Sequence, residues 1–309
     1  MSRGYGTYTS ANGSGAVYKA YYQTISTAIA AALGSRTADT GQVDWAAVST
    51  EPIGTVRDYE IFPLGAAIQG SAPLFIRVDY KGGTAGNTHG VFISTGTGTD
   101  GAGNLTGVTT PATVPASYGG INVGTRAVYA SSDRDSYFTL MYDTDVAGAS
   151  NTGALATVAA VVERTRTLAG DANGDGWVVH SWRYSSLTAT MYNGGWSRTF
   201  AGPSQPAAQE FTIPYLLPNP TILNTAFVSD TAYAFPTYPY AGNKVGGASK
   251  AFLLGLAVDF PRMSEISISH YGTQMAFLAW ADIYSHNMPY MTSATTAAQK
   301  QMMPILRWE

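Results

Sequence analysis

Apolar and polar positions follow a helical period only once in this chain, close to the N-terminus. In AVYKAYYQTISTAIAAALG (16–34), apolar side chains recur every fourth residue, at Val17, Tyr21, Ile25, Ile29 and Leu33. This spacing predicts an amphipathic helix. Ser14 is a suitable N-cap, and Gly34 is suited to end the helix. The opposite side is rich in Ala and polar residues, so we expect the helix to pack on a sheet or on a neighbouring subunit.

The rest of the pattern has a period of two. In PLFIRVDY (73–80), Leu74, Ile76 and Val78 share one face, while Arg77 and Asp79 lie on the other. This alternation indicates a strand with one buried face. Similar short apolar runs, bounded by Gly, Pro or polar residues, predict further strands at 56–62, 89–95, 126–130, 137–142, 154–165, 177–184, 187–192, 251–260, 265–272 and 274–283.

These elements predict a mainly β fold, organised as a β-sandwich-like domain with Gly-rich turns and one N-terminal amphipathic helix. We expect residues 1–15 to form a flexible or partner-bound arm. Residues 16–309 then make a single large domain without a clear internal boundary. Segment 202–250 is rich in Pro, Tyr and Asn and has little periodicity, which predicts long ordered loops.

Composition adds an expectation about partners. Charged residues make up only 12% of the 309 residues, about half the usual share, whereas Tyr occurs 20 times. Such neutral, aromatic surfaces are typical of subunit interfaces. The net charge of -3 favours neither nucleic acid nor an anionic membrane, and no apolar run is long enough for a membrane span. The absence of cysteine excludes disulfides and thiol chemistry.

The stretch STGTGTDGAGNLTG (94–107) contains a G-x-G-x-x-G pattern at Gly96, Gly98 and Gly101. A dinucleotide site needs a helix after these glycines and an acidic residue about 20 positions further on. The following AGNLTGVTTPATVPASYGG cannot begin a helix, and no acidic residue lies near position 120. We therefore expect a loop between two strands, in which the glycines allow positive φ. No cofactor is expected.

A second candidate is DANGDGWVV, in which Asp171, Asn173 and Asp175 match the first ligands of a calcium loop. The twelfth position should be a bidentate Glu, but Trp182 stands there. A β-hairpin turn would use the same Asn, Gly and Asp residues. The metal site therefore remains a weak alternative to a hairpin.

No spacing indicates a catalytic centre. The four histidines, at positions 89, 180, 270 and 286, show no metal-binding spacing, and no G-x-S-x-G motif occurs. A hydrolase with two carboxylates brought together by the fold stays a distant alternative, because such pairs are spatial rather than sequential. We expect that the protein is not an enzyme.

The order of several segments resembles a set of virion structural proteins of tailed bacteriophages. These segments are the N-terminal helix, VRDYEIFPLGAAI, PLFIRVDYKGGTAGNTHGVFISTGTGTDGAGNLTG, an ERT strand before a D-x-x-G-D-G turn, and the C-terminal LRWE. The resemblance covers most of the chain. It implies a homo-oligomeric structural protein of the neck, tail or baseplate, located in the virion after assembly in the host cytoplasm, with copies of itself and other virion proteins as partners.

Two alternatives to a neck, tail or baseplate subunit follow. The protein could be a head decoration protein, or a receptor- or glycan-binding protein displayed on the virion. For a glycan, the loop expected at YNGGWSRTF (192–200) offers Trp196 as a stacking side chain. The same tryptophan could instead pack beneath that loop.

Overall fold

The computed structural model describes the chain in segments. The described residues are 2–10, 18–47, 57–65, 73–81, 90–107, 124–145, 155–166, 172–185, 191–199, 202–206, 211–212, 233–236, 238–241, 244–245, 251–256, 265–270, 273–279 and 302–308. Over these residues the protein is mainly β, with one helix and several antiparallel sheets.

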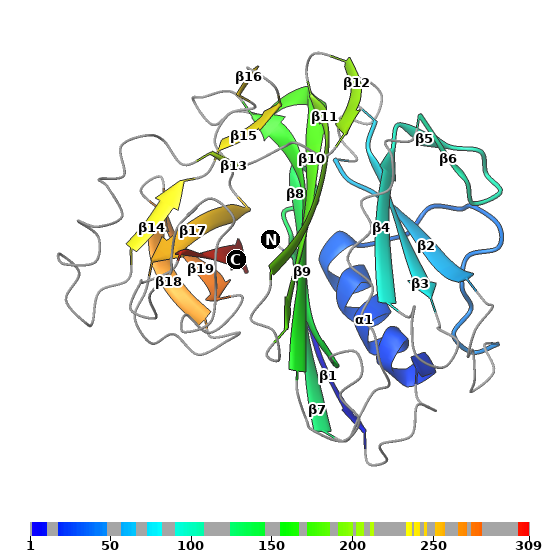
Figure 1. The fold of residues 1–309 in the computed structure, drawn as a ribbon. Helices are drawn as coiled ribbons and strands as arrows, with labels where there is room; N and C mark the ends of the chain where they lie inside the picture. The colour runs from blue at the N-terminus through cyan, green and yellow to red at the C-terminus, as the bar shows by residue number, and fades with distance from the viewer. Residues whose placement is uncertain are drawn as a thin grey trace.

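A seven-stranded antiparallel sheet forms the centre of the molecule (Figure 1). Its strands, in spatial order, are β1 (Ser2–Ser10), β7 (Gly124–Ser132), β8 (Tyr137–Asp145), β9 (Leu155–Arg166), β10 (Ala172–Ser185), β11 (Met191–Thr199) and β12 (Gly202–Pro206). From β7 to β12, each strand pairs with its neighbour in sequence. This order is typical of a meander of hairpins.

The expectation of a flexible or partner-bound arm at residues 1–15 needs correction over residues 2–10, which form strand β1 of the central sheet. These residues pair in unbroken antiparallel register with β7, from Ser2 opposite Ser132 to Ser10 opposite Gly124. Gly4 and Gly6 let the helix approach this strand, because a Cβ on Gly6 would lie 2.7 Å from Thr24 Cγ2.

Helix α1 (Tyr18–Leu33) and a three-stranded sheet cover one face of the central sheet (Figure 1). The expected packing of the helix on a sheet is therefore confirmed. Gly34 follows the helix with φ of 89°, and its N–H bonds Ala30 O at 2.8 Å, so it ends the helix as predicted. The small sheet contains β2 (Arg57–Pro63), β3 (Phe75–Lys81) and β4 (Gly90–Gly96).

The main apolar core lies between the central sheet and this covering layer. In β3, Ile76, Val78 and Tyr80 are buried, while Arg77 and Asp79 on the other face are only partly buried, as the period of two predicts. The helix contributes Ile25 and Ile29. The facing strands supply Tyr8, Val128, Ala130, Phe138, Leu140, Tyr142, Val158, Ala160, Val162, Trp177 and Val179.

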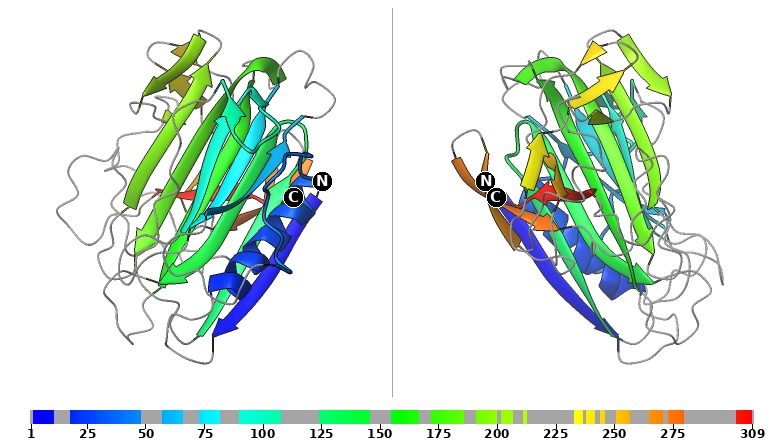
Figure 2. Two further views of the ribbon diagram at one scale, coloured as in Figure 1. Left: turned by 90° about the vertical axis from the view of Figure 1, so that its right-hand side faces the viewer. Right: turned by 60° about the vertical axis from the view of Figure 1, so that its left-hand side comes forward.

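A five-stranded sheet lies against the other face of the central sheet (Figures 1 and 2). The C-terminal strand makes the contact: Thr139 Oγ1 donates to Arg307 O at 3.0 Å, and the Arg307 guanidinium lies 5.0 Å from the Tyr137 ring. Trp308 packs edge-on against Tyr129. In spatial order, the strands are β14 (Tyr233–Pro236), β17 (Phe252–Leu256), β20 (Met302–Arg307), β19 (Thr273–Ala279) and β18 (Glu265–His270).

Two expectations about the second half of the chain need correction. The sequence predicts a strand at 187–192; residues 187–190 lie outside the described residues, and β11 extends beyond the predicted end, over Met191–Thr199. The sequence also predicts loops over 202–250, whereas the described residues of that segment belong to β12, β13 (Phe211–Thr212), β14, β15 (Tyr238–Ala241) and β16 (Lys244–Val245). Pairing with neighbouring strands, which composition does not reveal, places these Pro- and Tyr-rich residues in sheets.

The turn between β7 and β8 is fastened to the covering layer by a buried arginine. Asp133 Oδ1 accepts bonds from the backbone of Asp135, Ser136 and Tyr137 and so shapes the turn. The Arg164 guanidinium donates to Asp135 O in the turn and to Leu64 O after β2. Arg164 is 1% exposed, and burial lowers its pKa to about 10.

Candidate functional site

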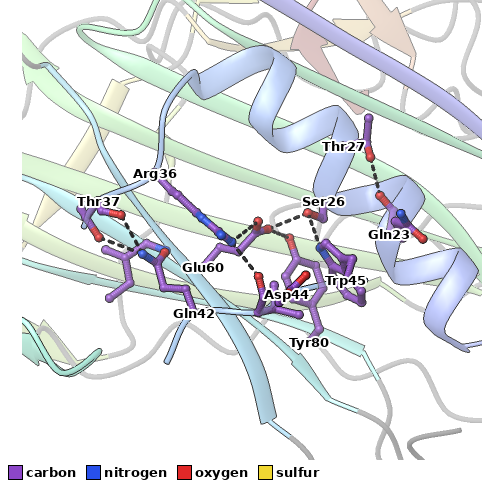
Figure 3. A network of polar contacts seen from close by, with 12 residues as sticks. Gln23, Ser26, Thr27, Arg36, Thr37, Gln42, Asp44, Trp45, Glu60 and Tyr80 are labelled. Carbon is purple, nitrogen blue, oxygen red and sulfur yellow. Dashed lines mark hydrogen bonds and ion pairs between the residues drawn. The ribbon is translucent and has the colours of Figure 1, made fainter. Parts of the chain in front are cut away.

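A group of hydrogen-bonded polar side chains lies between α1 and the small sheet (Figure 3). Glu60 on β2 accepts two hydrogen bonds at Oε2, both 2.7 Å long, from Ser26 Oγ on the helix and from the Tyr80 hydroxyl on β3. Trp45 Nε1 donates to Ser26 Oγ at 2.9 Å. Arg36 Nη1 lies 3.5 Å from Glu60 Oε1 and bonds the Val43 carbonyl.

The site is nearly closed to solvent. Glu60 and Ser26 are each 4% exposed, and Tyr80 is 1% exposed. Burial, followed by the neighbouring Glu60 carboxylate, raises the pKa of the Tyr80 hydroxyl well above its ordinary value. Tyr80 is therefore neutral near pH 7 and serves Glu60 as a hydrogen-bond donor.

Chemically, this arrangement is suited to holding the helix on the sheet. The Ser26 proton is held by Glu60, and the Ser26 oxygen already accepts a bond from Trp45. A serine nucleophile would need a base that removes its proton and an open path to substrate. The satisfied bonds and the burial favour a structural role for this group. No spacing in the sequence indicates this group, because its members come from four separate segments.

The Gly-rich stretch after β4 forms a hairpin. Its two short strands are β5 (Gly98–Thr99) and β6 (Leu105–Thr106). Asp100 closes the turn, because Oδ1 accepts bonds from the backbone of Ala102 and Asn104 and Oδ2 accepts one from Asn104 Nδ2. These bonds lower the pKa of Asp100, and the bond from the Asn104 side chain has the largest effect. The predicted turn is confirmed.

The glycines of this hairpin differ in role, which corrects one detail. Among the three of the G-x-G-x-x-G pattern, Gly101 has a positive φ of 77°. Gly96 and Gly98 are instead required by close packing: an added Cβ would lie 2.7 Å from Thr106 O and 2.6 Å from Thr106 Oγ1, respectively. Gly103, outside the pattern, has a φ of 92°.

The hairpin is held against the small sheet by Tyr59 and Arg77. The Arg77 guanidinium lies 4.1 Å from the Tyr59 ring, forms an ion pair with Asp79 and donates to Gly103 O. The backbone N–H of Gly103 donates to Asp39 at 3.4 Å. Although desolvation opposes ionisation, hydrogen bonds from Thr37, Thr99 and this backbone lower the pKa of Asp39.

Substituting Gly103 by Ala should therefore loosen the hairpin more than the same change at Gly101. Both residues have positive φ, for which alanine costs about 1 kcal/mol. At Gly103 the new methyl group would also overlap the Tyr59 hydroxyl, whereas nothing lies within 4 Å at Gly101. We expect urea unfolding to give a loss of roughly 3 kcal/mol for Gly103→Ala and about 1 kcal/mol for Gly101→Ala. Equal losses would contradict the packing argument.

The calcium candidates are only partly described. Asp171 lies outside the described residues, and the side chains of Asn173 and Asp175 do too. The backbone of both belongs to β10, where the pairing with β9 shifts register between Ala172 and Trp177. The two strands pair antiparallel, as the hairpin alternative requires. Within the described part of the chain, no group of three or more His, Asp or Glu residues could hold a metal ion.

The glycan candidate lies in a strand rather than in the expected loop. The backbone of Trp196 belongs to β11, opposite Val179 of β10 and Pro206 of β12. Its side chain lies outside the described residues. The Gly194–Gly195 pair suggested a loop, but pairing with β10 continues through both glycines.

The structure describes two of the four histidines, and of these only the backbone. His180 lies in β10 and His270 at the end of β18, while His89 and His286 lie outside the described residues. In the same part of the chain, no helix has both the length and the apolar character needed to cross a membrane.

No protein-family model, no curated protein and no solved structure matches this chain significantly.

Proposed function

We propose that this protein is a structural subunit of a tailed-bacteriophage particle, with a β-sandwich-like body, that assembles into the neck, tail or baseplate. The assignment to a bacteriophage particle rests on the sequence resemblance. One structural observation supports the architectural role: the polar groups most suited to chemistry join one element to another. Glu60 and Ser26 join the helix to the small sheet, and Arg77 joins the hairpin to it.

The composition supports the same role. With only 12% charged residues, the chain presents few charges that must lose hydration when subunits associate. The expectation of an aromatic surface needs correction in the described part, because Tyr21, Tyr22 and Tyr80 are buried in the core. The Gly-rich segment supports it as well, since its glycines build a rigid hairpin against the small sheet. This segment carries much of the resemblance, so the resembling residues serve the architecture of the fold.

Immunogold electron microscopy of purified particles, with antibody against this chain, tests the proposal. We expect label at the neck, tail or baseplate. Label over the head would replace this assignment with a head decoration protein. Label at the tail tip, together with glycan binding that is lost in Trp196→Ala, would favour receptor binding. Particles without label would overturn the virion assignment altogether.

A further inference from the structure

Strand β1 is one of the two outer strands of the central sheet (Figure 2). It pairs with β7 on one side, and no described strand pairs with it on the other. Its nine residues stay in register with β7 without a bulge. A long, regular outer strand presents backbone donors and acceptors that another strand can pair with.

The sequence of β1 carries few of the residues that usually protect a sheet edge. Such edges are commonly blunted by lysines, prolines, bulges or inward-pointing charges. SRGYGTYTS contains no proline and no lysine, and Arg3 is its one charged residue. Tyr5 is 59% exposed, and among the described residues no other large apolar side chain is exposed. The edge is therefore suited to association.

Side chains of β1 alternate between two environments. Gly4, Gly6 and Tyr8 point toward α1, and Tyr8 is buried in the core. The odd-numbered residues Arg3, Tyr5, Thr7 and Thr9 are exposed on the opposite face. A pairing strand must respect this alternation, because neighbouring residues in a sheet point to the same face.

The helix adds an uncharged surface along the same margin. Thr24 of α1 lies directly over Gly6 of β1. On a helix with 3.6 residues per turn, Ala20, Thr27 and Ala31 lie on the same side as Thr24. Ala20, Thr27 and Ala31 are exposed. Small, uncharged side chains of the helix thus lie next to the β1 edge and enlarge its uncharged surface.

We propose that β1 binds β1 of a second copy of this chain, antiparallel, about a two-fold axis at Gly6. The inference rests on the proposed function, of which it names the self-assembly surface. A two-fold axis that pairs two edge strands antiparallel must stand perpendicular to the sheet. Both helices therefore lie on the same face of the joined sheet. Only registers that pair odd residues with odd residues are then allowed, and the one centred on Gly6 pairs all nine residues.

The sequence of β1 is complementary to itself in this register. Arg3 lies opposite the partner's Thr9, so like charges are not opposed. Tyr5 lies opposite the partner's Thr7 and diagonal to the partner's Tyr5, within reach of an aromatic contact. Gly4 lies opposite the partner's Tyr8, which pairs a small residue with a large one. The two helix rows of Ala and Thr then face each other and permit close approach.

Cysteine crosslinking tests the contact and its register, because the natural chain contains no cysteine. Tyr5→Cys and Thr7→Cys proteins, mixed and oxidised, should form a disulfide-linked pair. Either variant alone should not, since residues diagonal to one another exceed the Cα separation that a disulfide tolerates. A mixture of Tyr5→Cys with Thr9→Cys serves as the control for a shifted register.

Charge variants measure the same contact without crosslinking. By analytical ultracentrifugation of the full chain, Thr9→Lys should weaken association about tenfold, because each lysine meets the partner's Arg3. Thr9→Glu should strengthen association. Thr125→Lys is the matched control. Thr125 is an exposed threonine on β7 whose hydroxyl bonds Thr9 Oγ1 at 3.0 Å, so both lysine variants lose this bond. Thr125 lies one strand away from the proposed contact, so its lysine should not weaken association.

Crosslinking in the Tyr5/Thr7 mixture, with opposite effects of Lys and Glu at Thr9, would establish the contact. An oligomer that neither crosslinks nor responds at Thr9 would overturn the β1 contact and leave the proposed function intact. A monomer at every concentration would overturn the β1 contact as well as self-assembly, while immunogold labelling would still decide separately whether the protein belongs to the virion.

Discussion

Arg164→Ala is expected to destabilise the protein by about 3–5 kcal/mol, the loss typical of breaking a buried polar network. Its guanidinium bonds Asp135 O in the β7–β8 turn and Leu64 O after β2. Alanine would leave both carbonyls without this donor and would create a cavity. Urea unfolding of the full chain, followed by tryptophan fluorescence, measures the loss.

Arg164→Lys separates the contribution of the charge from that of the geometry. Lysine keeps a positive charge but lacks the planar fork that reaches two carbonyls from one side chain. We expect a loss between that of alanine and zero. If lysine were as stable as the native residue, charge alone would suffice and the two-carbonyl bridge would not matter.

Glu60→Ala is expected to cost about 3 kcal/mol, because the buried Tyr80 and Ser26 hydroxyls would lose their shared acceptor. Glu60→Gln is the matched control. Its amide oxygen can still accept both bonds, although its NH₂ group would face Arg36, so we expect a loss of about 1 kcal/mol. Urea unfolding of both variants checks the difference.

The partners of Glu60 allow a sharper check on the same network. If Tyr80 acts through Glu60, then Tyr80→Phe should cost much less in the Glu60→Ala background than in the native protein. Additive losses in the double variant would mean that the two residues stabilise the fold independently. Such a result would contradict the network as it is drawn in Figure 3.

Much of the secondary structure followed from local patterns. The period of four around Ile25 and the period of two around Val78 predicted α1 and β3, because each pattern reflects one buried face. Composition was a poorer guide. It led to the expectation of a flexible or partner-bound arm at residues 1–15 and of a loop at 192–200, but residues 2–10 and 191–199 are strands. Their neighbours in the sheet stabilise an extended backbone that glycine by itself does not favour.

The candidate sites show the same limit. The hairpin at Gly98–Thr106 was predictable, because a turn needs only local residues such as Asp100 and Gly101. The Glu60 network was not, because Ser26, Trp45, Glu60 and Tyr80 are distant in sequence and no spacing relates them. Arg164 likewise reads as an ordinary strand residue until its contact with Leu64 O is known.

The sequence by itself determined that this protein is mainly β, with one amphipathic helix ended by Gly34, a Gly-rich turn after β4 and few charged residues. Only the tertiary structure decided that β1 is an outer strand of the central sheet and that Glu60 and Arg164 join separate elements. The physical reason is range: periodicity and turn chemistry act between residues a few positions apart, whereas strand order and buried polar contacts depend on which distant segments meet.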